Sequence, residues 1–380
     1  MFGGDIERDV PLFVKHETRD VWPILKDLIG GTETLAVIAL NGYFADQLGL
    51  WVSYSRRREY YSNRDCHPLL TYARVLAAIE FLESLGLIVH RRQSPGQRGW
   101  QSSFASTPEL NAIVETAISG RRLPLLMPRR SVILRDAKRN SLDPGYSRPV
   151  KRMERELAPI NETITSSTIL AEGLDLRAPL VRIFNVASDF SRCGRSFGRG
   201  TSWQNVEKKV RNSLHIDGEE TVELDFRNLH VAMLYCEEGL TPPADSYEIG
   251  YWDRRLVKAA LFRLLNGANE NKVRFGIATE VLKGRVDPGQ EFSEAARLIA
   301  DIKAAHRSIA HHFFTDVGSR LMRRDSDLAI NIMGALVGKG ITSLPVHDSF
   351  IVQQRNRDVL LAEMHEQSTI MGYDLEVTDA

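Results

Sequence analysis

Apolar residues recur at helical spacing in two segments of the first hundred residues, Leu35–Leu48 and Thr71–Gly86. The second segment ends at a glycine, as helices often do. The apolar runs LIVHRR and WQSSFAS follow, separated by the breaker SPGQRG, and predict a β-hairpin. Helices followed by a basic hairpin favour a winged-helix-like domain over residues 1–122.

The predicted hairpin carries three arginines that a DNA-binding wing would place against phosphates, Arg91, Arg92 and Arg98. An equally good interpretation is a winged helix that serves protein contacts or internal packing. Prolines then become frequent, and residues 123–149 are predicted to be a linker or extended arm. Val150–Ile169 predicts a helix interrupted near Pro159, and LVRIFNVAS predicts a strand after it.

Thr221–Tyr235 predicts a strand that ends at a carboxylate and turns directly into a helix. Val222 and Leu224 alternate with Glu223 and Asp225, and helical spacing follows. This arrangement commonly presents a metal ligand. A carboxylate favoured by the dipole at a helix N-terminus is the alternative interpretation of Asp225.

Tyr251–Lys272 predicts a helix with Asp253 as its cap and Gly267 as its stop. Arg254, Lys258 and Phe262 stand four residues apart and therefore share one face. Two cations one turn apart favour an anionic partner, and a triphosphate suits them. Ordinary surface cations on an amphipathic helix would give the same pattern.

Gly340–Gln353 predicts two short strands that meet at His347-Asp348, so that Asp348 lies at the tip of a hairpin. Taken alone, such a pair usually satisfies the hydrogen bonds of a turn. Further helices are predicted over Ala296–Phe314, Ser326–Gly340 and Asp358–Met371.

Composition adds limits to this picture. The 380 residues include 49 basic and 49 acidic ones, so the chain as a whole has no net attraction for nucleic acid. Basic residues cluster locally between Arg192 and Arg211. No apolar run is long enough to span a membrane, no signal peptide is evident, and three scattered cysteines form no pattern, so we expect a cytoplasmic protein of two or three domains.

Two aspartates at strand ends with a cationic helix between them suit a two-metal nucleotidyl transfer, with carboxylates holding the ions and cations neutralising a triphosphate. The motifs also resemble those of one enzyme family. LDFRNLH resembles motif A, RRLVKAALFRLLNG motif B and VHDSF motif C of the family A (Pol I-like) DNA polymerases and the single-subunit phage RNA polymerases. The resemblance runs from about Arg192 to the C-terminus.

The resemblance implies an α+β right-hand fold within residues 150–380. Its reduced thumb would occupy about 150–190, its palm about 191–240 and 300–380, and its fingers about 241–299. Asp225 and Asp348 would bind two Mg²⁺ ions, with Mn²⁺ as an alternative. The residues implied in nucleotide binding are Arg254, Lys258, Phe262, Asn266 and His230, and those implied in primer-template binding are Arg195, Arg199, Gln204 and His347.

Three departures from the family pattern leave the choice of sugar open. His230 stands where the DNA polymerases usually have glutamate, Asn266 replaces an expected tyrosine, and Ser349 follows Asp348 as in the RNA polymerases. The fingers are short, and no acidic cluster indicates a proofreading exonuclease. The chain therefore resembles small polymerases and primase-like enzymes of phages and mobile elements.

The function that we expect is template-directed DNA synthesis from nucleoside triphosphates on a primer-template, with a replication accessory protein as a possible further partner and no membrane. A primase with the same site is the first alternative. The second is a non-catalytic, winged-helix DNA-binding replication initiator. Retention of both aspartates favours an enzyme, because paired carboxylates repel one another without metal.

Overall fold

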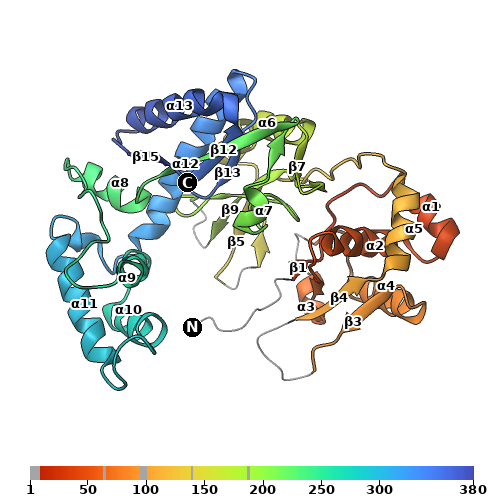
Figure 1. The fold of residues 1–380 in the computed structure, drawn as a ribbon, viewed down its shortest axis with the longest axis horizontal. Helices are drawn as coiled ribbons and strands as arrows, with labels where there is room; N and C mark the ends of the chain where they lie inside the picture. Colours follow the sequence, from red (N-terminus) through yellow and green to blue (C-terminus); the bar gives the residue numbers. More distant parts are fainter. Residues whose placement is uncertain (1–8, 63–65, 95–100, 138–139, 186–188) are drawn as a thin grey trace. The chain divides into compact units, whose positions relative to one another are not determined.

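The computed structural model describes residues 9–62, 66–94, 101–137, 140–185 and 189–380 (Figure 1). Helices account for 46% of the chain and strands for 16%, which confirms the predicted α+β class. The chain divides into two compact units. We call the described residues up to Val181 together with Phe197–Thr221 the N-terminal unit, and Arg182–Ser196 together with Val222–Ala380 the C-terminal unit.

The first part of the N-terminal unit combines helices with a four-stranded sheet of order β1-β2-β4-β3. Strand β1 runs parallel to β2, and β4 runs antiparallel to β2 and β3. The two predicted helices and the predicted hairpin, which are α2, α4 and β3–β4, are confirmed. The elements are β1 (Val10–Pro11), α1 (Trp22–Ile29), α2 (Glu33–Asp46), β2 (Val52–Tyr54), α3 (Arg58–Tyr61), α4 (Tyr72–Ser84), β3 (Ile88–Arg91), β4 (Ser102–Ser106) and α5 (Pro108–Ile118).

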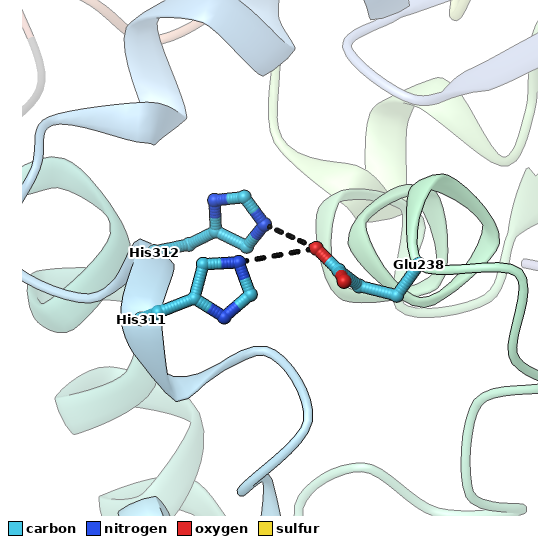
Figure 2. Close-up of side chains that lie close together, drawn as sticks. All are labelled: Glu238, His311 and His312. Carbon is cyan, nitrogen blue, oxygen red and sulfur yellow. Dashed lines mark hydrogen bonds and ion pairs between the residues drawn. The ribbon is translucent and has the colours of Figure 1, made fainter.

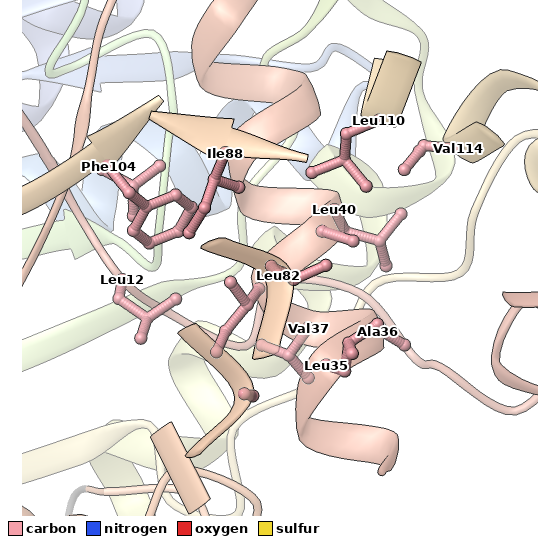
Figure 3. Packing of buried hydrophobic residues seen from close by; sticks show 14 of the residues in the cluster. Leu12, Leu35, Ala36, Val37, Leu40, Leu82, Ile88, Phe104, Leu110 and Val114 are labelled. Carbon is pink, nitrogen blue, oxygen red and sulfur yellow. The ribbon is translucent and has the colours of Figure 1, made fainter. Parts of the chain in front are cut away.

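Helix α2 lies at the centre of this part, and its residues are buried on almost all sides (Figure 3). Leu35 and Val37 belong to the same apolar cluster as Phe104 of β4 and Leu82 of α4. Gly42 allows α2 to approach the sheet, since a Cβ there would lie 3.4 Å from the ring of Phe104. Close packing of this kind explains why small and apolar residues lie on nearly all sides of α2.

The segment predicted as a linker, residues 123–149, contains an antiparallel pair of strands, β5 (Val132–Arg135) and β6 (Ser141–Leu142). Its last proline lies in the first turn of α6 (Arg148–Ser166), where a missing N–H costs nothing. Helix α6 also continues through Pro159, so the predicted interruption is wrong. Apolar residues on both sides of Pro159 are buried on one face and hold the helix together: Val150, Met153, Leu157, Ile160 and Ile164.

The remaining strands explain why the two units do not follow the predicted boundaries at residues 122 and 149. Strands β9 (Leu180–Asn185), β10 (Ser196–Gly198) and β12 (Glu219–Phe226) each run through a boundary between the units. Where a strand passes from one unit to the other, the amino-acid composition does not change at the boundary, so the sequence does not reveal it. The N-terminal unit is completed by β7 (Ile169–Ala171), β8 (Leu174–Asp175), α7 (Lys208–Arg211) and β11 (His215–Ile216).

In the C-terminal unit, β14 and β15 each pair with β12, and β13 pairs with β14. The long helix α12 packs against α8, α9 and α13, while α9, α10 and α11 pack against one another (Figure 1). The elements are α8 (Leu229–Glu237), α9 (Arg254–Asn266), α10 (Glu270–Gly276), a π-helical turn (Ile277–Val281), α11 (Glu291–Ala305), a 3₁₀ turn (Ala310–His312), α12 (Val317–Gly338), β13 (Leu344–Val346), β14 (Ser349–Gln353), a second 3₁₀ turn (Gln354–Asn356), α13 (Arg357–Ile370) and β15 (Val377–Asp379).

The elements that carry the predicted motifs are all present. Strand β12 leads directly into α8, and β13 and β14 form a hairpin in which Val346 pairs with Ser349. Helix α9 begins at its predicted cap, where the Asp253 carboxylate accepts hydrogen bonds from the backbone N–H groups of Arg255 and Leu256. Local sequence signals therefore predict these three elements correctly.

Among the described residues, no single helix has both the length and the apolar character needed to cross a membrane. Helices α1 and α2 satisfy both criteria only when taken together, as a pair bent by 95°.

Candidate active site

Asp225 and Asp348 are brought to neighbouring strands of the C-terminal unit. Strands β12 and β14 are adjacent, and the backbone N–H of Phe226 donates to the carbonyl oxygen of Asp348 over 3.3 Å. A residue in the left-handed region lies near each aspartate: Asn228 (φ 52°) stands three residues after Asp225, and His347 (φ 63°) directly precedes Asp348. Non-glycine residues rarely adopt this conformation, and it is frequent at functional sites.

Asp225 carries a charge that the protein itself does not fully compensate. Its Oδ1 is buried and has no hydrogen-bond partner. Burial, followed by the charges of Asp348 and Glu223, raises the pKa of Asp225 from 3.8 to about 6, and Lys258 only partly offsets this shift. A buried acceptor without a donor is costly, and a bound cation would remove that cost.

Glu223 adds a third carboxylate to this part of β12. It precedes Asp225 by two residues and therefore lies on the same face of the strand. The buried hydroxyl of Ser349 donates to Glu223 Oε1 over 2.5 Å. Ser349, which follows Asp348, thus binds a carboxylate that comes from the neighbouring strand.

Asp325 of α12 joins two of the predicted site residues, Arg195 and His230. Its carboxylate is 2% exposed, and Oδ2 accepts a hydrogen bond from Arg195 Nη2 over 2.5 Å and lies 2.7 Å from His230 Nε2. Burial alone would lower the pKa of Arg195, but the hydrogen bond and charge of Asp325, together with the charge of Asp348, raise it. Arg195 is therefore a fixed cation whose field reaches Asp348.

Helix α9 presents its cations around a buried tyrosine, Tyr247. The Arg254 guanidinium lies 5.0 Å from the Tyr247 ring centroid and donates to Asp245 Oδ2 over 2.7 Å. Lys258 Nζ lies 5.7 Å from the same ring. Burial raises the pKa of Tyr247; Arg254 opposes this shift, and Asp348 and Asp225 add to it. Tyr247 thus lies within electrostatic range of both the cations and the aspartates.

The other predicted residues of the C-terminal unit differ in their accessibility. Phe262 is 60% exposed, and His347 is exposed at the tip of the hairpin. Asn266 donates from Nδ2 to the carbonyl oxygen of Phe262 over 2.8 Å. It also packs against Gly318, where an added Cβ would lie 2.2 Å from Asn266 Oδ1. Asn266 therefore helps to seat the end of α9 on α12.

Arg199 and Gln204 belong to the N-terminal unit. The Arg199 guanidinium stacks 4.6 Å from the centroid of the Phe13 ring, and Gln204 Oε1 accepts from the backbone N–H of Gly198 over 2.8 Å. Within this unit, Arg199 packs on an aromatic ring and Gln204 supports a loop. Asp225 and Asp348 belong to the other unit.

The predicted wing arginines are held by side chains of their own unit. Arg91 stacks on Trp51 at 5.0 Å and pairs with Asp9, and Arg92 donates to Glu83 over 2.5 Å. Arg98 lies outside the described residues. Of the two interpretations of this hairpin, internal packing therefore has direct contacts in its favour.

Sequence reasoning missed Asp325 and Tyr247 and gave Glu223 no role. A signal existed only for Glu223, since it alternates with apolar residues in phase with Asp225. Nothing in the RRDSD context distinguishes Asp325 from a surface carboxylate.

The chain matches no model of a known protein family. A search of curated proteins also finds no match.

Proposed function

We propose that the C-terminal unit is the polymerase domain of a template-directed nucleotidyltransferase of the family A type, and that it synthesises DNA. The observation that carries this proposal is the partnerless, buried Oδ1 of Asp225 beside Asp348. Carboxylate oxygens are the ligands that Mg²⁺ and Mn²⁺ prefer, so the residues present fit the proposed ions.

In this proposal Asp225 and Asp348 hold two divalent ions. When bound, such ions lower the pKa of an attacking 3′-hydroxyl and stabilise the leaving pyrophosphate. Lys258 neutralises part of the triphosphate, while Asp245 and Tyr247 orient Arg254 for the same purpose. The exposed ring of Phe262 is available to stack against the incoming base or sugar.

The remaining roles concern the primer-template. Asp325 orients Arg195 toward the primer end and holds His230 beside it. His347 would pack against the primer terminus. Arg199 and Gln204 stay proposals for template contact through the N-terminal unit. In a right-hand architecture, β12–β15 with α8 and α12 would form the palm and α9–α11 the reduced fingers.

RNA synthesis or priming by the same site is the second candidate. Two observations favour it: His230 replaces the glutamate that usually excludes ribose, and Ser349 follows Asp348 as in the RNA polymerases. The side chain of His230 is held in place by Asp325, whose Oδ2 lies 2.7 Å from His230 Nε2. Position 230 is therefore ordered although it carries no glutamate. A non-catalytic DNA-binding protein would have no use for the charge cluster at Asp225.

The test is nucleotide incorporation in Mg²⁺ with deoxyribonucleotides or ribonucleotides, with and without a primer. We expect the wild-type protein to extend a primed template and Asp348→Ala to incorporate nothing while still binding DNA. The matched control is Asp358→Ala, whose side chain is 92% exposed on α13. Absence of incorporation by the wild-type protein on every template, or full activity of Asp348→Ala, would refute the proposal.

A further inference from the structure

A second cluster of side chains that could hold a metal ion is drawn in Figure 2. It lies at the opposite end of α8 from His230 of the candidate active site. It consists of Glu238, which ends α8, and the neighbouring residues His311 and His312 of the 3₁₀ turn before α12. His230 lies in the first turn of the same helix. The eight residue steps from His230 to Glu238 rise about 12 Å along the helix, so the two sites are separate.

The three side chains converge on one point. Glu238 Oε1 lies 3.1 Å from His311 Nε2 and 3.0 Å from His312 Nε2. Tetrahedral ligands at about 2.0–2.1 Å from a zinc ion are about 3.3 Å from one another. The two separations from Glu238 therefore need to grow by only a few tenths of an ångström to admit an ion, and the three ligand atoms all lie within 4.8 Å of one another.

The backbone fixes these positions on both sides. Ile309 and Phe313, which flank the two histidines, are buried, and the His312 carbonyl oxygen accepts from Thr315 Oγ1 over 2.6 Å. The backbone N–H of Glu238 donates to carbonyl oxygens of the last turn of α8. The side chains themselves remain accessible, since His311 is 59% and Glu238 33% exposed.

The chemistry of the donor set selects the ion. Two imidazole nitrogens and one carboxylate suit Zn²⁺ and its neighbours in the first transition row, whereas Mg²⁺ prefers oxygen ligands alone. Three protein ligands leave the fourth tetrahedral position for water. The two imidazole rings lie 4.0 Å apart between centroids, and the Nε2 atoms of both face Glu238 Oε1 (Figure 2).

We propose that Glu238, His311 and His312 form a Zn²⁺ site that cross-links the end of α8 to the turn preceding α12. Each imidazole binds the ion through the Nε2 lone pair as the neutral tautomer that carries its proton on Nδ1, and Glu238 supplies an oxygen. A ring protonated at both nitrogens releases its Nε2 proton to solvent on binding, whereas a neutral ring only moves its proton from Nε2 to Nδ1. Because α8 and α12 also carry His230 and Asp325, the ion would stabilise the two helices that frame the candidate active site.

The experiment measures Zn²⁺ binding by the full-length, metal-free protein in competition with a chromophoric chelator. Millimolar Mg²⁺ is present throughout to occupy the carboxylates at Asp225 and Asp348. We expect one Zn²⁺ equivalent that a double variant, His311→Ala with His312→Ala, no longer binds. Each single substitution should weaken binding at least about tenfold. Zn²⁺ should raise the Tm of the wild-type protein and leave that of the double variant unchanged.

The matched control is His365→Ala, an exposed histidine on α13 outside the cluster. It should bind Zn²⁺ as the wild-type protein does, and all variants retain the three cysteines. Equal Zn²⁺ stoichiometry in the double variant, or no bound equivalent in the wild-type protein, would overturn the proposal. Neither readout depends on catalysis, so a failure here leaves the proposed polymerase function untouched, and the reverse also holds.

Discussion

Replacing Asp225 with asparagine should abolish nucleotide incorporation and, in the absence of metal, make the protein more stable. Asparagine has nearly the same shape as aspartate but carries no charge. The substitution therefore removes a proposed metal ligand and also removes the repulsion from Asp348 and Glu223. Opposite effects on activity and stability are expected where a site stores unfavourable charge for its ligand.

The magnitude follows from the pKa of Asp225, which rises from 3.8 to about 6 in the folded protein. Between these values the native state binds more protons than the unfolded chain, so the wild-type free energy of unfolding falls as pH rises through this window and stays low above it. At about 1.4 kcal/mol per unit, the ionised carboxylate destabilises the fold by about 3 kcal/mol at pH 7.5 and about 1.5 kcal/mol at pH 5. Because Asp225 is only partly buried, solvent screening reduces this effect, and these values are upper limits for the gain of Asp225→Asn.

The assay is guanidinium unfolding of wild-type and Asp225→Asn protein in a chelator at pH 5 and pH 7.5. The variant should be the more stable one at both pH values, and its advantage should shrink by roughly half at the lower pH. Asp358→Asn, at a side chain that is 92% exposed, should show no advantage. Added Mg²⁺ should then stabilise the wild-type protein alone. A variant less stable than wild type at pH 7.5, or an advantage independent of pH, would refute the electrostatic argument.

Two further substitutions test the group around Asp325. Asp325→Asn leaves the partly buried Arg195 without its counter-charge. The free energy of unfolding should therefore fall by about 2–3 kcal/mol, and the Kd for primer-template should rise. Unchanged values of both quantities would show that the pair is dispensable. His230→Ala should change the ratio of ribonucleotide to deoxyribonucleotide incorporation, because His230 would stand at the sugar-reading position of the proposed polymerase site, and an unchanged ratio would exclude it from that role.

Elements with strong local signals were predictable from the sequence. The alternation before Asp225, the hairpin at His347-Asp348 and the cap at Asp253 are each set by neighbouring residues, and the structure contains all three. That the strand before Asp225 and the hairpin at His347-Asp348 lie side by side was expected only because the motifs resemble those of a known family. Periodicity cannot show which strands become neighbours, because strand order depends on contacts between distant segments.

Other features depend on tertiary packing and leave no local signal. Pro159 lies inside a continuous helix because buried apolar residues on both sides outweigh the lost hydrogen bond. Asp325 looks like a surface carboxylate in the sequence, yet it is buried between Arg195 and His230. Such a pairing links residues 130 positions apart, and no pattern within one segment can reveal it.

The balance of charges at the candidate active site argues for a bound cation. Arg195 is neutralised by Asp325, and Arg254 by Asp245. Among Arg195, Arg254 and Lys258, Lys258 is the one for which the described part of the chain shows no ion pair, and its charge only partly offsets the rise in the pKa of Asp225. Of these three cations, only Lys258 is thus left, within the described part of the chain, to balance the carboxylates of Asp225, Asp348 and Glu223. Divalent ions with a triphosphate would complete this balance, whereas a site that never binds metal would be more stable with any one of the carboxylates replaced.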